Sequence, residues 1–148
     1  YQIDCIFCDE FFYVRKKAYF EQILGLHEEY KEKATEIANK MVDSGNFIGS
    51  EKLLELIETK PSIHKKLLKV EKIGSYTNLT TNDMKRMCRV CKKYNDKLPM
   101  KDGKLVVESE ADIDVVLKAL ADYYKIGEIS KKSYGTFSGK ELKGTTSK

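Results

Sequence analysis

The fold class is decided by residues 60–94, which have the sequence KPSIHKKLLKVEKIGSYTNLTTNDMKRMCRVCKKY. Apolar residues recur at intervals of three and four on both sides of Gly74, and this period predicts two amphipathic helices. Pro61 suits the first turn of the first helix, because its missing N–H would be unpaired there. Thr80 and Asp83 have the spacing of a capping box for the second helix. This stretch therefore predicts a helical core.

The pattern changes toward both ends of the chain. β-branched and aromatic residues predict a strand pair at residues 2–8 and 11–14, and a second pair at 126–129 and 134–137. Helical periodicity predicts further helices over 16–24 and 27–42, one capped by Ser50 and one capped by Ser109. We therefore expect a helix-dominated single α+β domain over residues 1–142 with small β elements near both ends, followed by a frayed tail at 143–148.

Composition excludes several classes of protein. The chain has 148 residues, 41% of them hydrophobic, and no apolar run approaches the ~18 residues of a membrane span. Residue 1 is Tyr, and no basic segment followed by an apolar one indicates a secretion signal. The simplest interpretation is a segment of a longer protein that lacks an N-terminal part. Four cysteines are too few for a disulfide scaffold, so we expect a cytoplasmic protein.

Charge is distributed unevenly along the chain. Residues 1–59 carry seven basic and twelve acidic residues, whereas residues 60–93 carry ten basic and two acidic ones. A basic block of this kind is typical of a surface that binds nucleic acid or an acidic partner, although a solvated helix face would look the same. Within it, helical spacing places six side chains on two stripes, and we predict that they contact nucleic-acid phosphates: Lys65, Lys66, Lys69, Arg86, Arg89 and Lys93.

Two Cys-x-x-Cys pairs, Cys5 with Cys8 and Cys88 with Cys91, raise the alternatives of a zinc site and a redox pair. The first pair lies in a predicted strand, where positions three apart point to opposite faces. The second pair lies on the apolar stripe of a predicted helix together with Met84. We therefore favour structural cysteines and expect neither a metal nor another cofactor.

No residue pattern names a reaction. The two histidines, His27 and His64, lie on charged helix faces, and His64 beside two lysines is expected to belong to the basic surface. No glycine-rich phosphate loop is present. The carboxylates of residues 108–114 fit the N-terminal turn of a helix better than a metal-dependent nuclease site. We expect no enzyme and no small-molecule substrate.

The chain nevertheless resembles a known family. The resemblance rests on residues 3–9 (IDCIFCD), 12–14 (FYV), 17–26 (KAYFEQILGL), 64–69 (HKKLLK) and 115–122 (VVLKALAD), together with Tyr134 and Lys140. These segments are similar to the C-terminal part of KwaB-like proteins of the Kiwa anti-phage defence system, over roughly residues 2–142. The resemblance implies a bacterial protein that binds DNA during phage defence and self-associates, with a small membrane protein of the same system as a partner. It supplies no catalytic residues.

Two functions follow as hypotheses. The first is a non-catalytic DNA-binding component that contacts phosphates without reading sequence. The second is a protein–protein interaction or oligomerisation domain, in which the acidic first third of one chain pairs with the basic middle of another. Binding to DNA at two salt concentrations would separate them.

Overall fold

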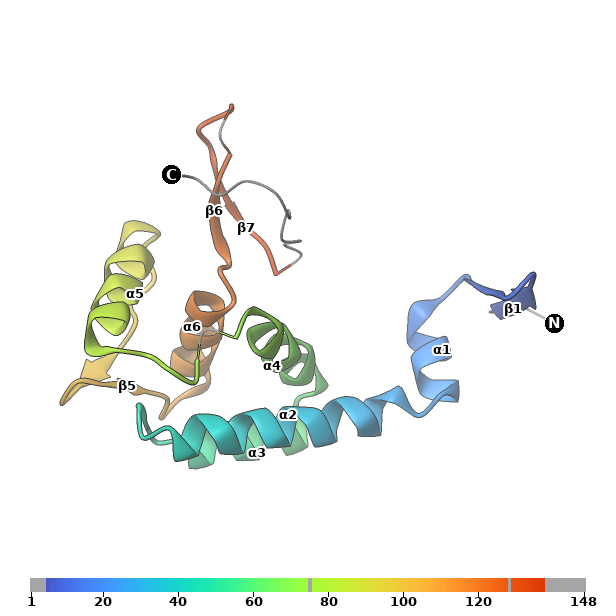
Figure 1. The fold of residues 1–148 in the computed structure, drawn as a ribbon, viewed down its shortest axis with the longest axis horizontal. Coiled ribbons are helices and arrows are strands. Elements are labelled where there is room, and N and C mark those ends of the chain that lie inside the picture. The colour runs from blue at the N-terminus through green and yellow to red at the C-terminus, as the bar shows by residue number, and fades with distance from the viewer. Residues whose placement is uncertain (1–4, 75, 128, 138–148) are drawn as a thin grey trace.

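The computed structural model describes residues 5–74, 76–127 and 129–137. Within these residues the chain forms six α-helices and seven short strands, with strands near both ends of the described segment. Figure 1 shows most of the helices grouped into one body, with an arm that carries a short helix at the N-terminal side and a hairpin at the C-terminal side. The predicted helix-dominated α+β fold is confirmed. The predicted domain end at residue 142 and the tail at 143–148 lie outside the described residues.

The arm consists of a β-hairpin and a short helix. Strands β1 (Cys5–Cys8) and β2 (Phe11–Val14) pair antiparallel, as the sequence predicted. The turn residues Asp9 and Glu10 have φ of 50° and 67°, and positive φ at both positions is what a two-residue hairpin turn requires. Helix α1 (Lys17–Ile23) follows, and Gly25, with φ of 64°, redirects the chain into α2.

Four helices form the body: α2 (Leu26–Asp43), α3 (Glu51–Thr59), α4 (Pro61–Ile73) and α6 (Glu110–Leu120). Helix α2 packs along α3 and α4, and α6 packs against α3 and α4 (Figure 1). Each helix contributes its apolar stripe to one core, which includes Ala38, Leu53, Leu67 and Leu117. The period that predicted the helices thus also identifies the residues they bury.

Helix ends follow the predicted signals with one exception. Pro61 is in the first turn of α4, and Gly74 ends that helix in a left-handed conformation. Thr80 and Ser109 both form capping boxes, with Asp83 and Asp112 respectively. Ser50 precedes α3 but has a helical backbone and makes no side-chain cap, so the predicted Ser50 cap is wrong.

A small sheet closes one end of the body. Strand β5 (Lys104–Val106) pairs antiparallel with β4 (Met100–Lys101) across a turn at Asp102 and Gly103, and parallel with β3 (Phe47–Ile48). Helix α5 (Thr81–Lys93) packs on this sheet and on α6. Gly49 follows β3, and a Cβ there would approach the Cα of Glu108 to 3.1 Å, so a glycine permits this close crossing.

A second hairpin leaves the end of α6. Its strands are β6 (Tyr124–Ile126) and β7 (Ser133–Gly135), whereas the sequence predicted pairing over 126–129 and 134–137. The hairpin therefore exists but starts earlier than expected. None of the helices in the described segments combines the length and apolarity that crossing a membrane would need.

Candidate nucleic-acid interface

The predicted lysines of α4 lie against carboxylates. Lys65 Nζ donates to both oxygens of Glu21 at 3.1 and 2.8 Å, and Lys17 Nζ lies 3.5 Å from the same carboxylate. The Glu21 side chain is only 4% exposed. The hydrogen bond from Lys65 lowers the pKa of Glu21, against the opposing effect of burial. Lys65 thus neutralises a buried acid and attaches α1 to α4.

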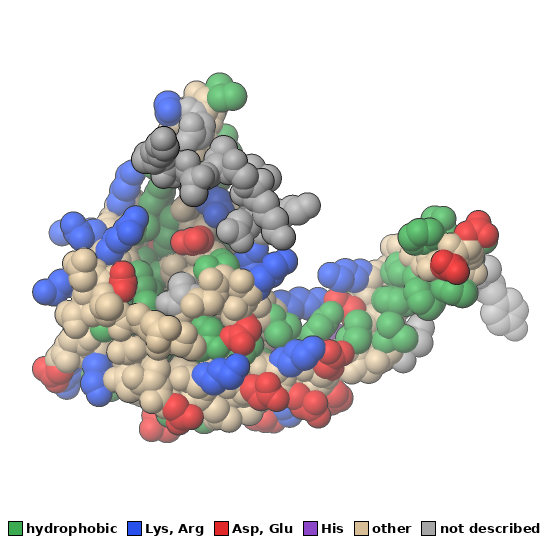
Figure 2. Space-filling view, viewed as in Figure 1, with side chains coloured by type: hydrophobic (Ala, Val, Ile, Leu, Met, Phe, Trp, Pro, Cys, Tyr) green, Lys and Arg blue, Asp and Glu red, His purple; other side chains and the backbone are tan. Residues whose placement is uncertain are grey.

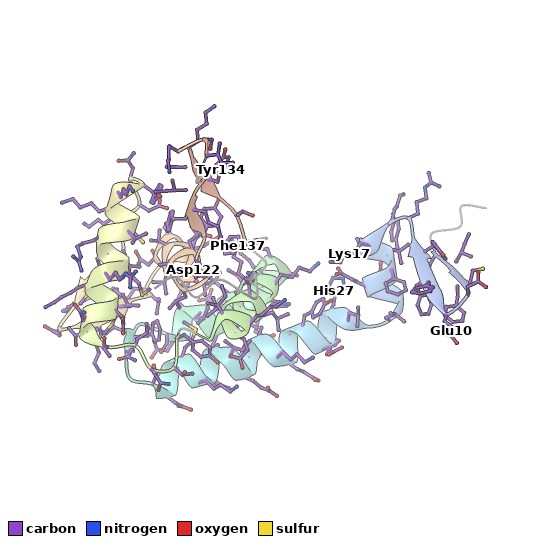
Figure 3. The ribbon with its side chains drawn as sticks, turned by 45° about the horizontal axis from the view of Figure 1, so that its top comes forward. Glu10, Lys17, His27, Asp122, Tyr134 and Phe137 are labelled. Carbon is purple, nitrogen blue, oxygen red and sulfur yellow. The ribbon has the colours of Figure 1, made fainter. Side chains whose placement is uncertain are left out.

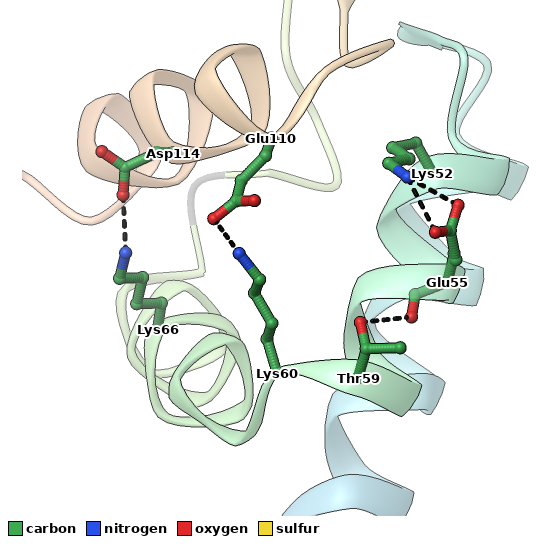
Figure 4. Close-up of polar contacts among 7 residues, drawn as sticks. All are labelled: Lys52, Glu55, Thr59, Lys60, Lys66, Glu110 and Asp114. Carbon is green, nitrogen blue, oxygen red and sulfur yellow. Dashed lines mark hydrogen bonds and ion pairs between the residues drawn. The ribbon is translucent and has the colours of Figure 1, made fainter.

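Lys66 and Lys60 connect α4 to α6 in the same way (Figure 4). Lys66 Nζ donates to Asp114 at 2.6 Å, and Lys60 pairs with Glu110. Burial alone would raise the pKa of Asp114, but hydrogen bonds from Lys66 and Lys118 outweigh it and lower the pKa. The charges of Lys66 and of Lys60, the residue before α4, are therefore largely balanced within the molecule.

The third predicted α4 residue, Lys69, is half-buried and also has an interaction partner. The three predicted α4 lysines therefore all interact with other groups of the protein. Their contact with nucleic-acid phosphates stays a prediction.

Two side chains within the basic segment of residues 60–93 are buried. His64 is 5% exposed, and its Nε2 lies 2.7 Å from the carbonyl oxygen of Ile57, to which the Nε2–H donates a hydrogen bond. The prediction that His64 belongs to the basic surface is wrong, because its position on α4 faces α3. Tyr76 is 1% exposed, and its hydroxyl donates a hydrogen bond to Glu71.

Helix α5 presents the other half of the predicted surface, and it differs from α4. Met84 and Cys91 face the core. Five exposed cations occupy the opposite side, and none forms an ion pair with a described residue: Lys85, Arg86, Arg89, Lys92 and Lys93. Asp83, in the cap, is the one acid of this helix. We call these five residues the α5 basic face.

Lys85 and Lys92 were not among the predicted site residues. Lys85 lies four positions before Arg89, and Lys92 lies three positions after it, so all three are neighbours on a helix. The same spacing rule that selected Arg86, Arg89 and Lys93 could have found them.

The two predicted stripes are not adjacent. Helix α6 packs against both α4 and α5 and lies between them in the body (Figure 1). Figure 2 shows basic side chains gathered over α5 and acidic ones along α2 and α3. The α5 basic face is thus one coherent positive surface on its own side of the molecule.

The second cysteine pair is part of the packing of α5. Cys91 is fully buried, and Cys88 Sγ contacts the carbonyl oxygen of Leu98 at 3.8 Å and Met100 Sδ at 3.6 Å. Burial raises the pKa of both thiols, which disfavours the thiolate that metals and redox chemistry use. Over residues 5–74, 76–127 and 129–137, no three His, Cys, Asp or Glu side chains gather in a metal-binding cluster.

The comparison with known families agrees with the resemblance inferred from the residues. The model of the family described as "Kiwa protein KwaB-like" matches residues 1–130. No curated protein and no solved structure matches the chain. The family match covers most of the 148 residues, including every helix in the described part of the chain and the α5 basic face. This chain therefore belongs to the KwaB-like family of Kiwa proteins, and with it to the Kiwa anti-phage defence system.

Proposed function

We propose that the chain is a non-catalytic, DNA-binding component of the Kiwa system that contacts phosphates through the α5 basic face. The observation that carries this proposal is the set of five exposed cations on one helix, none of them paired with a described acid. Lysine and arginine in this arrangement attract phosphate without reading base sequence. Cations without an ion pair can attract phosphate with their full charge. The α4 residues Lys65 and Lys66 instead form ion pairs with Glu21 and Asp114.

The absence of a catalytic role is part of the proposal. Two of the carboxylates in residues 108–114 have structural partners: Asp112 caps α6, and Asp114 binds Lys66 and Lys118. The buried His64 is engaged with a backbone carbonyl. These contacts favour a binding surface over an active site.

The test is a charge reversal with a matched control. Arg86→Glu with Arg89→Glu changes two charges on the α5 basic face, and Lys33→Glu with Lys40→Glu makes the same net change on α2. Lys33 and Lys40 form exposed surface ion pairs, which water and salt screen, so replacing these lysines should cost the fold little. We expect the α5 variant to lose at least about tenfold in affinity for duplex DNA, and the α2 variant to lose much less. Equal losses would contradict the proposal.

A second candidate function is self-association through the arm. The hairpin exposes Phe7, Phe11, Phe12 and Tyr13, each more than half accessible. An exposed apolar patch of this kind is typical of a protein contact, and an isolated two-stranded hairpin is only marginally stable alone. We propose a second copy of this chain as the partner. A small membrane protein of the same system remains a further proposed partner, which rests on family membership.

A further inference from the structure

A pocket of about 390 Å³ lies between α5 and the end of α6, beside the start of β6. Its volume falls in the range of ligand pockets, roughly 300–1,000 Å³. Apolar walls are formed by Met87 and Val90 from α5 and by Ala119 and Leu120 from α6. The pocket is therefore a slot between two helices, with faces suited to a flat apolar group.

The polar groups of this pocket are two carboxylates and one guanidinium: Asp83, Asp122 and Arg86. Asp83 uses its Oδ2 to accept hydrogen bonds from the backbone N–H and hydroxyl of Thr80, which leaves Oδ1 outside the cap. Asp122 follows α6 with φ of 49°, is exposed, and makes no ion pair with a described residue. Figure 3 shows Asp122 beneath the β6–β7 hairpin. The pKa of Asp83 is lowered by the hydrogen bonds from Thr80 and also by the charge of Arg86, which lines the same pocket. Both carboxylates can accept hydrogen bonds from a ligand.

One wall of the pocket is held in place. The Tyr124 hydroxyl donates to Asp96 at 2.5 Å, and its ring stacks on Tyr94 with centroids 5.0 Å apart. A fixed wall reduces the ordering cost that a bound ligand would incur.

The charges that line the pocket indicate which chemical group of a ligand it can bind. The pocket holds two carboxylates against one guanidinium, so its net charge is negative and disfavours a phosphate. The carboxylates accept hydrogen bonds from an amine, and apolar walls suit the face of a ring. The α5 basic face begins at the rim, because Arg86 belongs to both surfaces. We propose that the pocket binds an unpaired nucleobase with an exocyclic amine, while the α5 basic face binds the phosphates of the same single strand. This inference rests on the proposed function and deepens it.

The base must be unpaired for a chemical reason. In a duplex the amines of cytosine and adenine are engaged in base pairing, and the ring faces are stacked, whereas single strands can place a base in a protein pocket. Carboxylates recognise the N4 amine of cytosine. Uracil has a carbonyl oxygen at that position, which a carboxylate repels. The pocket should therefore discriminate between these two bases of equal ring size.

The experiment compares oligo(dC) and oligo(dU) of equal length at neutral pH, by fluorescence anisotropy. We expect the wild-type chain to bind oligo(dC) more tightly by about fivefold or more, the lower end of the discrimination that a specific base contact provides. Asp122→Gly removes one carboxylate at a left-handed position that glycine tolerates, and it should bring the two affinities together. Asp102→Gly is the matched control. Asp102 also has a positive φ and is exposed, but it does not line the pocket, so its variant should keep the preference.

A second measurement does not depend on any variant. The chain has four methionines, of which Met87 lines the pocket and Met41 is buried in α2. With labelled methionine methyl groups, oligo(dC) should shift the Met87 resonance and leave Met41 unchanged. Equal affinity for the two homopolymers, an unchanged preference in Asp122→Gly, or no Met87 shift on binding would overturn the pocket assignment while leaving phosphate binding intact. If neither homopolymer nor duplex DNA binds, the proposed function fails as well.

Discussion

At the scale of single residues, the informative side chains are the buried polar ones. Among the described residues, Glu21 and His64 are the polar side chains classed as buried. Each has a partner that offsets the cost of leaving water: Lys65 for Glu21, and the carbonyl of Ile57 for His64. These contacts join α1 to α4 and α4 to α3, so they fix the placement of the helices around the core.

The Glu21–Lys65 pair makes the arm sensitive to pH. The folded-state pKa of Glu21 lies below its ordinary value of 4.5, so the ionised carboxylate stabilises the fold above that pH. This contribution is lost as the pH falls through the folded-state pKa. We expect Glu21→Gln to destabilise by on the order of 1 kcal/mol at neutral pH, and by progressively less below pH 4.5. Urea unfolding across this range measures the difference, and a difference independent of pH would contradict the assignment.

His64 should matter for stability and not for DNA binding. His64→Ala leaves a buried carbonyl without its donor and opens a cavity, so we expect a loss of about 2 kcal/mol or more. His27→Ala is the matched control, because His27 is exposed on α2 and should cost little. Thermal unfolding gives the comparison. If the His64→Ala variant kept wild-type stability but bound DNA more weakly, the structural role of His64 would be contradicted and a role in the basic surface supported.

At the scale of elements, α4 and α5 show how one sequence pattern can have two meanings. Both are basic, 13-residue amphipathic helices. Helix α4 lies between α1 and α6, whose acids pair with its lysines, whereas α5 lies at the outer side of α6 and its cations face solvent (Figure 1). The tertiary position of each helix, not its composition, decides whether its charge is available.

This difference gives a paired prediction. Lys66→Gln breaks the bond to Asp114 and should lower stability with little effect on DNA affinity. Arg89→Gln removes one cation of the α5 basic face and should weaken DNA binding by roughly threefold to tenfold with little effect on stability. Unfolding and DNA titration of both variants measure the two effects. If Lys66→Gln weakened DNA binding and Arg89→Gln lowered stability instead, the DNA interface would lie on α4 and not on α5.

The elements also show which features sequence can predict. Local signals identified the capping boxes at Thr80 and Ser109, the β1–β2 hairpin and the end of α4 at Gly74. Strand β3 was missed because it has two residues and pairs with β5, far along the chain. The acid partners of the α4 lysines were missed for the same reason, since Glu21 and Asp114 are 44 and 48 positions from Lys65 and Lys66. Contacts between residues far apart in the sequence produce no periodic pattern in either segment, so a sequence reading cannot detect them.

At the scale of the whole molecule, opposite charges and apolar surface lie in different places. The α5 basic face is on one side, acidic side chains follow α2 and α3, and the aromatic arm extends beyond the end of α2 (Figures 1 and 2). In Figure 3 the tip residue Glu10 lies at the far end of this arm, away from the body. Because of this separation, the proposed DNA binding through α5 and the proposed contact of the arm with another copy would not exclude each other.

Self-association through the arm has a direct test. Phe11 is 66% exposed on β2, and Phe11→Asp should shift the chain toward monomer at high concentration in sedimentation experiments. Ile129→Asp is the matched control, because Ile129 is 99% exposed on the other hairpin. Equal association of wild type and Phe11→Asp, or monomer throughout, would contradict an interface on the arm.

The salt dependence of duplex DNA binding tests the central claim most directly. Five cations on one helix face can neutralise about three to five phosphates, and counterion release then gives a slope of roughly −3 to −4.5 in log affinity against log salt. Replacing Arg86 and Arg89 with Gln removes two of these charges and should flatten the slope by about 2. A wild-type slope near zero, or the same slope in the wild type and this double variant, would contradict DNA binding through the α5 basic face.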